Sequence, residues 1–240
     1  MSKTKASLIH LSLSVLVISF IFLLIFFVWY PSPFDKTQGI SEILYLMLIV
    51  DLFLGPLLTF VVYKQGKRGL ATDLSIIATI QISALIYALY VVHKERPAYI
   101  VHAIDRYEVV TASEVNMQES SIPEMEIGFF TKPNYIYVES PKGDAMAQLV
   151  IDVLSGASND LERLPQYYQL YEKNIEQVLS KGKELSSIAN QLSLPKGIDP
   201  KEYLFAPIVG KRKDMLALIN KKTGYPEQFI DVDPWTIENN

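Results

Sequence analysis

The side chains best placed to do chemistry lie inside an apolar stretch, residues 40–63, which an aspartate interrupts. Asp51, Gly55 and Thr59 follow one another at intervals of four residues, which places them along one face of a helix. A carboxylate at the centre of a membrane-spanning helix costs about 2.5–3.5 kcal/mol, and such residues usually face a helix bundle or a cavity. The chemistry predicted for this face is therefore close helix packing and hydrogen bonding.

Pro56 lies beside Gly55 on the same helix and has no backbone N–H to donate. We expect it to bend the helix or to loosen its hydrogen bonding, as prolines do in membrane helices whose neighbours satisfy the freed groups.

A second stripe of small and polar residues follows in the next apolar stretch, where Gln81, Ala84 and Ala88 have helical spacing and Tyr87 lies beside them. Asp51 and Gln81 both come out near the middle of a bilayer, because each residue of a helix rises 1.5 Å. We predict that the two stripes pack together, with Asp51 within hydrogen-bond reach of Gln81. The stripes either join a hairpin or leave a polar face open for a transmembrane helix of another chain. The candidate residues for helix packing or partner binding are Asp51, Gly55, Pro56, Thr59, Gln81, Ala84, Tyr87 and Ala88.

Three apolar spans are predicted, at about residues 8–30, 40–63 and 72–92, each long enough to cross the hydrocarbon. The first is longer than the apolar core of a signal peptide, and no small-residue cleavage site follows it, so it is interpreted as a retained anchor. His10 lies close to one end of this span and is interpreted as an interfacial residue.

The orientation of the spans follows from their basic residues, because positive loops stay in the cytoplasm. The N-terminus and the loop at 64–69 together carry five Lys or Arg, whereas the loop between the first two spans carries only Lys36. These counts predict a cytoplasmic N-terminus and a C-terminal domain on the opposite side of the membrane.

The remainder of the chain, residues 97–240, has the composition of a globular α+β domain. Residues 93–240 carry 16 Lys or Arg and 22 Asp or Glu, and this acidic balance argues against nucleic acid as a partner. One strand is predicted over 98–110, one near 127–130, and others over 135–138, 203–209, 215–220 and 229–232. Helices are predicted over 145–154 and 167–191, the latter weakened by Gly182. The candidate residues at the junction with the membrane region, 1–96, are Arg96, Pro97, Asp105 and Arg106, the last two as a local ion pair or a head-group contact.

Motifs of the common enzyme classes are missing from the sequence: there is no phosphate-binding glycine loop, no H-E-x-x-H and no G-x-S-x-G. His93 and His102 have no neighbours at metal-ligand spacing. Asp231-Val232-Asp233 matches a metal-binding D-x-D of transferases, but three such letters recur by chance. We expect no enzyme activity, no catalytic residue, no metal and no cofactor.

Several segments together resemble the type IV pilin accessory proteins of the TfpX/TfpZ type. The resemblance is densest over 48–110, and it is carried by 51–59, Asp73-Leu74, 81–87, 96–110 and the closing Asp233-Pro234-Trp235. It implies a multi-pass protein of the bacterial inner membrane with a periplasmic C-terminal domain. It also implies the role of an accessory or chaperone-like factor that stabilises one type IV pilin and promotes pilus assembly.

The partners that the resemblance implies are the major type IV pilin, through both its transmembrane helix and its periplasmic head, and the lipid bilayer. Two other classes of protein stay open. One is a membrane-bound transferase that modifies pilin or lipid at the periplasmic face, and the other is a signalling protein that senses a ligand, although the short loops leave no cytoplasmic output domain.

Overall fold

A computed structural model describes residues 1–237. The chain divides into two compact units, of which the first contains residues 1–31 and 40–96 and the second contains residues 32–39 and the chain from Pro97 onward. The sequence analysis placed residues 32–39 within the membrane region, whereas the structure groups them with the second unit.

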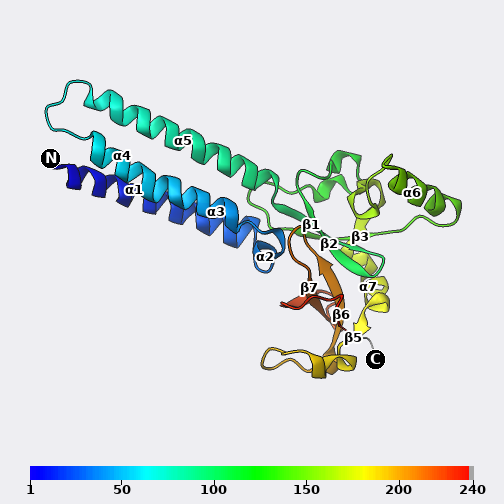
Figure 1. The fold of residues 1–240 in the computed structure, drawn as a ribbon. Helices are drawn as coiled ribbons and strands as arrows, with labels where there is room; N and C mark the ends of the chain where they lie inside the picture. Colours follow the sequence, from blue (N-terminus) through cyan, green and yellow to red (C-terminus); the bar gives the residue numbers. More distant parts are fainter. Residues whose placement is uncertain (238–240) are drawn as a thin grey trace. The chain divides into compact units, whose positions relative to one another are not determined.

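The first unit consists of helices, three of which are long and apolar enough to cross a membrane (Figure 1). They are Lys3–Trp29, made of α1 (Lys3–Leu24) and the π-helix η1 (Ile25–Trp29); Ser41–Val62, made of α3 (Ser41–Leu48), the π-helix η2 (Ile49–Leu54) and α4 (Gly55–Val62); and α5 (Leu70–Lys94). The predicted fold class, three transmembrane helices followed by an α+β domain, is confirmed.

The second span changes its hydrogen-bond pattern just before Pro56. Residues 49–54 form a π-helix, and the Gly55 N–H donates to the Val50 carbonyl, five residues back. The missing N–H of Pro56 removes one α-helical bond here, so the chain widens by a π-bulge, a feature that recurs at functional sites. The predicted loosening at Pro56 is confirmed, and it surrounds Asp51.

The second span lies centrally among the three. In its most apolar 18-residue window 28% of the residues are buried, against 17% for each of the other two spans. The first and third spans meet near one end, where the Tyr30 hydroxyl donates to the Val92 carbonyl at 3.0 Å and the rings of Trp29 and His93 lie 5.0 Å apart. This end of the helical unit is closed by aromatic and aliphatic packing.

The second unit is built on one mixed sheet in the order β4-β3-β1-β2-β6-β7-β8, with β5 paired to β6. The strands are β1 (Pro97–Ala103), β2 (Arg106–Thr111), β3 (Asn134–Val138), β4 (Tyr168–Leu170), β5 (Lys183–Glu184), β6 (Tyr203–Val209), β7 (Met215–Asn220) and β8 (Pro226–Ile230). The helices are α2 (Phe34–Gln38), α6 (Asp144–Ser155) and α7 (Ile175–Lys181). Short 3-10 helices fill the connections at Met117–Glu119, Pro123–Met125, Leu161–Arg163, Pro165–Tyr167, Tyr171–Asn174, Leu185–Ser187, Ala189–Gln191 and Pro200–Glu202.

Two predictions of long elements in this unit were wrong. The extended stretch 98–110 is a hairpin rather than one strand, since Ile104 takes a left-handed backbone conformation (φ 61°) and turns the chain into β2. The helix predicted over 167–191 exists only as α7, because residues on either side join the sheet as β4 and β5. Gly182 ends α7 where the backbone passes so close to Leu204 that a Cβ would lie 2.9 Å from its side chain.

No strand forms at 127–130, a segment without regular structure. The predicted helix at 145–154, ended by Gly156, and the hairpin of β6 and β7 are confirmed.

The short segment 32–39 is fixed to the second unit by backbone hydrogen bonds. The carbonyl of Thr37 accepts from the N–H groups of Arg212 and Lys213 at 2.9 and 3.3 Å, in the turn between β6 and β7. Phe34 is buried in the core of this unit, and its ring lies 6.1 Å from that of Phe229. Residues between two membrane spans thus form part of the globular core.

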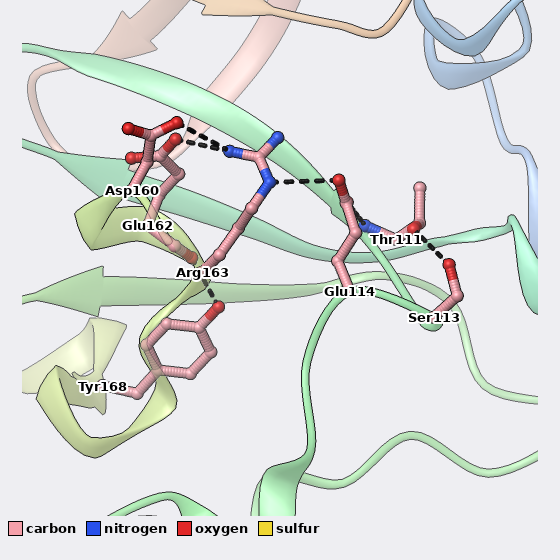
Figure 2. A network of polar contacts seen from close by, with 7 residues as sticks. All are labelled: Thr111, Ser113, Glu114, Asp160, Glu162, Arg163 and Tyr168. Carbon is pink, nitrogen blue, oxygen red and sulfur yellow. Dashed lines mark hydrogen bonds and ion pairs between the residues drawn. The ribbon is translucent and has the colours of Figure 1, made fainter. Parts of the chain in front are cut away.

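A charged cluster around Arg163 covers part of the sheet (Figure 2). The Arg163 side chain donates to Glu114 at 3.0 Å and to Glu162 at 2.5 Å, and Glu114 in turn accepts from the Thr111 N–H at 2.7 Å. Because Glu114 bonds both a side chain and a strand backbone, this cluster connects the 3-10 helix Leu161–Arg163 to the end of β2.

Gly210→Ala should destabilise the second unit by about 1–3 kcal/mol, because its Cβ would lie 2.6 Å from the Thr37 carbonyl oxygen and force the 32–39 segment away. The control is Gly128→Ala, whose Cβ meets nothing closer than 3.9 Å. Chemical unfolding of the full chain in detergent measures both variants. Equal stabilities would contradict the packing described for 32–39.

Glu108 on β2 should make the stability of the protein depend on pH. Burial, with the nearby Glu162 carboxylate, raises the pKa of Glu108 from 4.5 to about 7. The folded state therefore holds a proton that the unfolded state has lost, so the stabilisation is complete below pH 4.5 and is lost as the pH rises through 7. Glu108→Gln should raise the melting temperature at pH 8 by about 2–4 °C and leave it nearly unchanged at pH 4.5. An equal shift at both pH values would contradict this assignment.

Candidate functional site

An open groove of about 420 Å³ lies among the three spanning helices. One face of α1 forms one wall, the facing side of α5 forms the other, and the second span forms the floor. The lining residues are Met1, Ala6, Ile9, His10, Leu13, Ser14, Val17, Ile18, Asp51, Thr59, Tyr63, Leu74, Ala78, Gln81, Ile82 and Leu85. On α1 and on α5 these positions recur at intervals of three and four residues, so each wall is a continuous helix face.

Asp51 and Gln81 meet at this groove. Gln81 Nε2 lies 3.4 Å from Asp51 Oδ1 and 3.4 Å from the Val50 carbonyl oxygen. Both side chains are only 7% exposed. The contact predicted between these two residues is confirmed.

Gly55 lets the second and third spans approach at this level. A Cβ at this position would lie 2.0 Å from Gln81 Nε2, so any larger residue would displace the glutamine. The small residue and the polar pair therefore form one packing unit, because the close approach is what brings Gln81 to Asp51.

The orientation of the Gln81 amide follows from its neighbours. The Val50 carbonyl can only accept a hydrogen bond, so the amide end that faces it and Asp51 Oδ1 is the NH₂ group. The other end is the carbonyl oxygen Oε1, which is buried and has no hydrogen-bond partner within residues 1–237.

The first span adds polar contacts to the floor of the groove. His10 Nδ1 lies 2.6 Å from Thr59 Oγ1, and the Ser7 hydroxyl donates to the Pro56 carbonyl at 2.9 Å. His10 was interpreted only as an interfacial residue, whereas the structure joins it to the second span. The signal that sequence reasoning missed is the spacing of Ser7, His10 and Ser14, which share one helix face.

The stripe predicted on the third span is wrong in part. Ala84 and Tyr87 are exposed, and Ala88 is half-buried. The buried face runs instead through Ile77, Gln81 and Val92. Ala84 is rotated about 60° from Gln81 on an ideal helix, toward the side away from the groove, so its small size does not place it in the contact.

The four junction candidates fall into two groups. Arg96 is buried at the end of the helical unit and donates to the His93 carbonyl at 2.7 Å, and Pro97 begins β1. Asp105 and Arg106 form the predicted local ion pair at 3.1 Å in the β1–β2 turn, and Arg106 also lies 5.1 Å from the centre of the Trp235 ring.

Within residues 1–237, no group of three or more His, Cys, Asp or Glu residues is placed to hold a metal ion. His102 is buried between the rings of Tyr107 and Tyr137, and this burial lowers its pKa to about 4. Asp231 forms an ion pair with Lys213, and the Asp233 carboxylate accepts from the Trp235 N–H. These contacts give the two aspartates of the D-x-D sequence structural partners.

Comparison with known proteins relates the chain to fimbrial assembly. Residues 1–39 match the family described as fimbrial assembly protein FimB. The chain is 28% identical to the fimbrial assembly protein of Dichelobacter nodosus serogroup I, over 97% of this chain and 96% of that protein. It is 37% identical to the protein of serogroups C1 and C2 from the same organism, over 48% of this chain and 89% of that protein. No solved structure matches the chain.

The contact between His10 and Thr59 should couple the first and second spans by about 0.6–1.7 kcal/mol, the range of interhelical hydrogen bonds in membrane proteins. The measurement is a double-mutant cycle of His10→Leu and Thr59→Val, with unfolding followed in mixed micelles. In the control cycle, Ser12→Ala replaces the histidine variant, because the Ser12 hydroxyl donates to Leu8 on its own helix. Additive effects in the first cycle would show that the contact contributes nothing.

Proposed function

Because the chain belongs to the FimB family of fimbrial assembly proteins, we propose that it holds the transmembrane helix of a pilin subunit in its intramembrane groove until the subunit is assembled. The observation that carries this proposal is the groove itself, which is mostly apolar, lies between α1 and α5 and has polar groups at its floor. The role in fimbrial assembly comes from the family, and the groove supplies a means by which the chain would perform it.

A helix is the occupant that the shape of the groove favours. Both walls are helix faces, and both flanking spans pack on the second span. A fourth helix lying between α1 and α5 would complete a four-helix arrangement, in which each helix touches two neighbours. Small and polar residues such as Ala6, Ser14 and Ala78 line the walls and allow close approach of another backbone.

The physical need for such a factor follows from the membrane as a solvent. A single apolar helix that carries a polar group cannot satisfy that group in lipid, so it pairs wrongly or is degraded. Each interhelical hydrogen bond that shelters it contributes about 0.6–2 kcal/mol, which is enough to hold a subunit reversibly. Reversible binding suits a factor that must release its client.

The proposed location is the bacterial inner membrane, with the N-terminus in the cytoplasm and the second unit in the periplasm. Support comes from the five basic residues in the N-terminal segment and the 64–69 loop. In this orientation the sheet-containing unit lies on the side where a pilin head is found, and we propose that it contacts the head and contributes selectivity. The proposal assigns no catalytic step to the protein.

Filling the groove should lower pilin levels without unfolding the chain. Leu13→Trp and Ile82→Trp enlarge exposed side chains that line the groove. Their controls, Leu16→Trp and Ile80→Trp, enlarge equally exposed side chains that do not line it. We expect the groove variants to accumulate normally but to reduce co-purified pilin and surface pili several-fold, as measured by immunoblotting and electron microscopy.

Replacing the packing unit of Asp51, Gly55 and Gln81 gives a second set of variants. Asp51→Leu, Gly55→Leu and Gln81→Leu should also reduce pilin levels while the protein itself still accumulates. Normal piliation in the groove-filling variants would contradict the proposal. Loss of these three variants from the membrane would show that Asp51, Gly55 and Gln81 serve only internal packing.

A further inference from the structure

Among the side chains of residues 1–237, the groove contains one buried polar atom without a hydrogen-bond partner. Gln81 Oε1 has less than 1 Å² of accessible surface and accepts no hydrogen bond from any of residues 1–237. We propose that this oxygen accepts a hydrogen bond from a donor side chain at the middle of the bound helix, and so selects helices that carry such a donor. This inference rests on the proposed function of the groove.

Two contacts prevent the amide from presenting its other end. Nε2 is held by Asp51 Oδ1 and by the Val50 carbonyl, which also accepts the Gly55 N–H. A rotated amide would place its oxygen against the Val50 carbonyl, which can only accept, so Oε1 remains the end of the amide without a partner. Asp51 therefore acts as a positioning residue, and Gln81 makes the contact with the occupant.

The unpaired acceptor Oε1 of Gln81 would distinguish a helix that carries a donor from a lipid chain. A buried carbonyl left without a donor costs free energy in hydrocarbon. An acyl chain has no donor and would leave Oε1 unsatisfied, whereas a hydroxyl, a carboxamide or a protonated carboxyl on a neighbouring helix would satisfy it. The same oxygen disfavours a wholly apolar helix, so it provides selectivity by rejection as well as by attraction.

The depth of Gln81 also restricts where the donor must be. Gln81 is the twelfth of the 25 residues of α5, so it lies about halfway along this span. A donor displaced by one helical turn would lie about 5.4 Å from the matching level and could not reach Oε1. The selected feature is thus a donor at mid-span rather than general polarity.

The test uses the full chain in phosphatidylcholine vesicles. The sequence has no cysteine, so Arg68→Cys accepts a single fluorescent donor in the 64–69 loop. The probes are synthetic transmembrane helices of leucine and alanine that carry an energy-transfer acceptor. They differ at one central position, which is asparagine or the near-isosteric leucine, and in a third probe the asparagine is moved by four residues.

We expect the wild-type chain to bind the central-asparagine helix about threefold to thirtyfold more tightly than the leucine helix, and the shifted helix no better than leucine. Gln81→Met should abolish the preference. Leu85→Met, which alters the same wall without removing a polar atom, should keep it.

Three results would overturn the inference. Equal binding of the asparagine and leucine helices by the wild-type chain would show that water or lipid satisfies Oε1, while the groove would still hold a helix as proposed. A preference that survives in Gln81→Met would assign the selection to another group. Absence of binding by every helix would overturn this inference and the proposed function together. The shifted probe tests the inference on the wild-type chain even where Gln81→Met does not fold.

Discussion

A polar group inside hydrocarbon needs a partner, and this requirement organises the helical unit. Pro56 removes a backbone donor, and a π-helix precedes it. The Val50 carbonyl accepts the Gly55 N–H in this π-helix, and Gln81 donates both to that carbonyl and to Asp51. Gly55 makes the arrangement possible, because any Cβ there would collide with Gln81. These residues depend on one another, so their packing fixes the register of the second and third spans.

The two ends of the helical unit differ in how completely they are packed. Around Tyr30 and Val92 the first and third spans are joined by a hydrogen bond and by ring contacts. Toward the N-terminus of α1 both spans rest on the second span, and the groove lies between them. Residues 1–237 leave this apolar surface uncovered and give Gln81 Oε1 no partner. These two features favour the proposed binding site over a hairpin held together by polar contacts.

Much of this arrangement could be predicted from the sequence, because membrane helices obey simple rules. The spans, the Asp51–Gln81 contact and the effect of Pro56 follow from hydropathy, helical spacing and depth. The exposure of Ala84 and Tyr87 could not be predicted, since the rotation of α5 about its own axis is set by its whole contact with the second span. The helix expected over 167–191 failed for a similar reason. Its apolar residues suit a helix locally, but β4 and β5 pair with strands distant in the sequence, and that pairing prevailed.

Site-specific photocrosslinking in cells that make the pilin tests the central claim most directly. A photoreactive amino acid would replace Leu13 and Ile82, which line the groove, or Leu16 and Ile80, which do not. The account predicts that the groove positions crosslink to the pilin transmembrane segment and that the other two positions crosslink mainly to lipid. Equal pilin crosslinking from all four positions, or none from the groove, would contradict it.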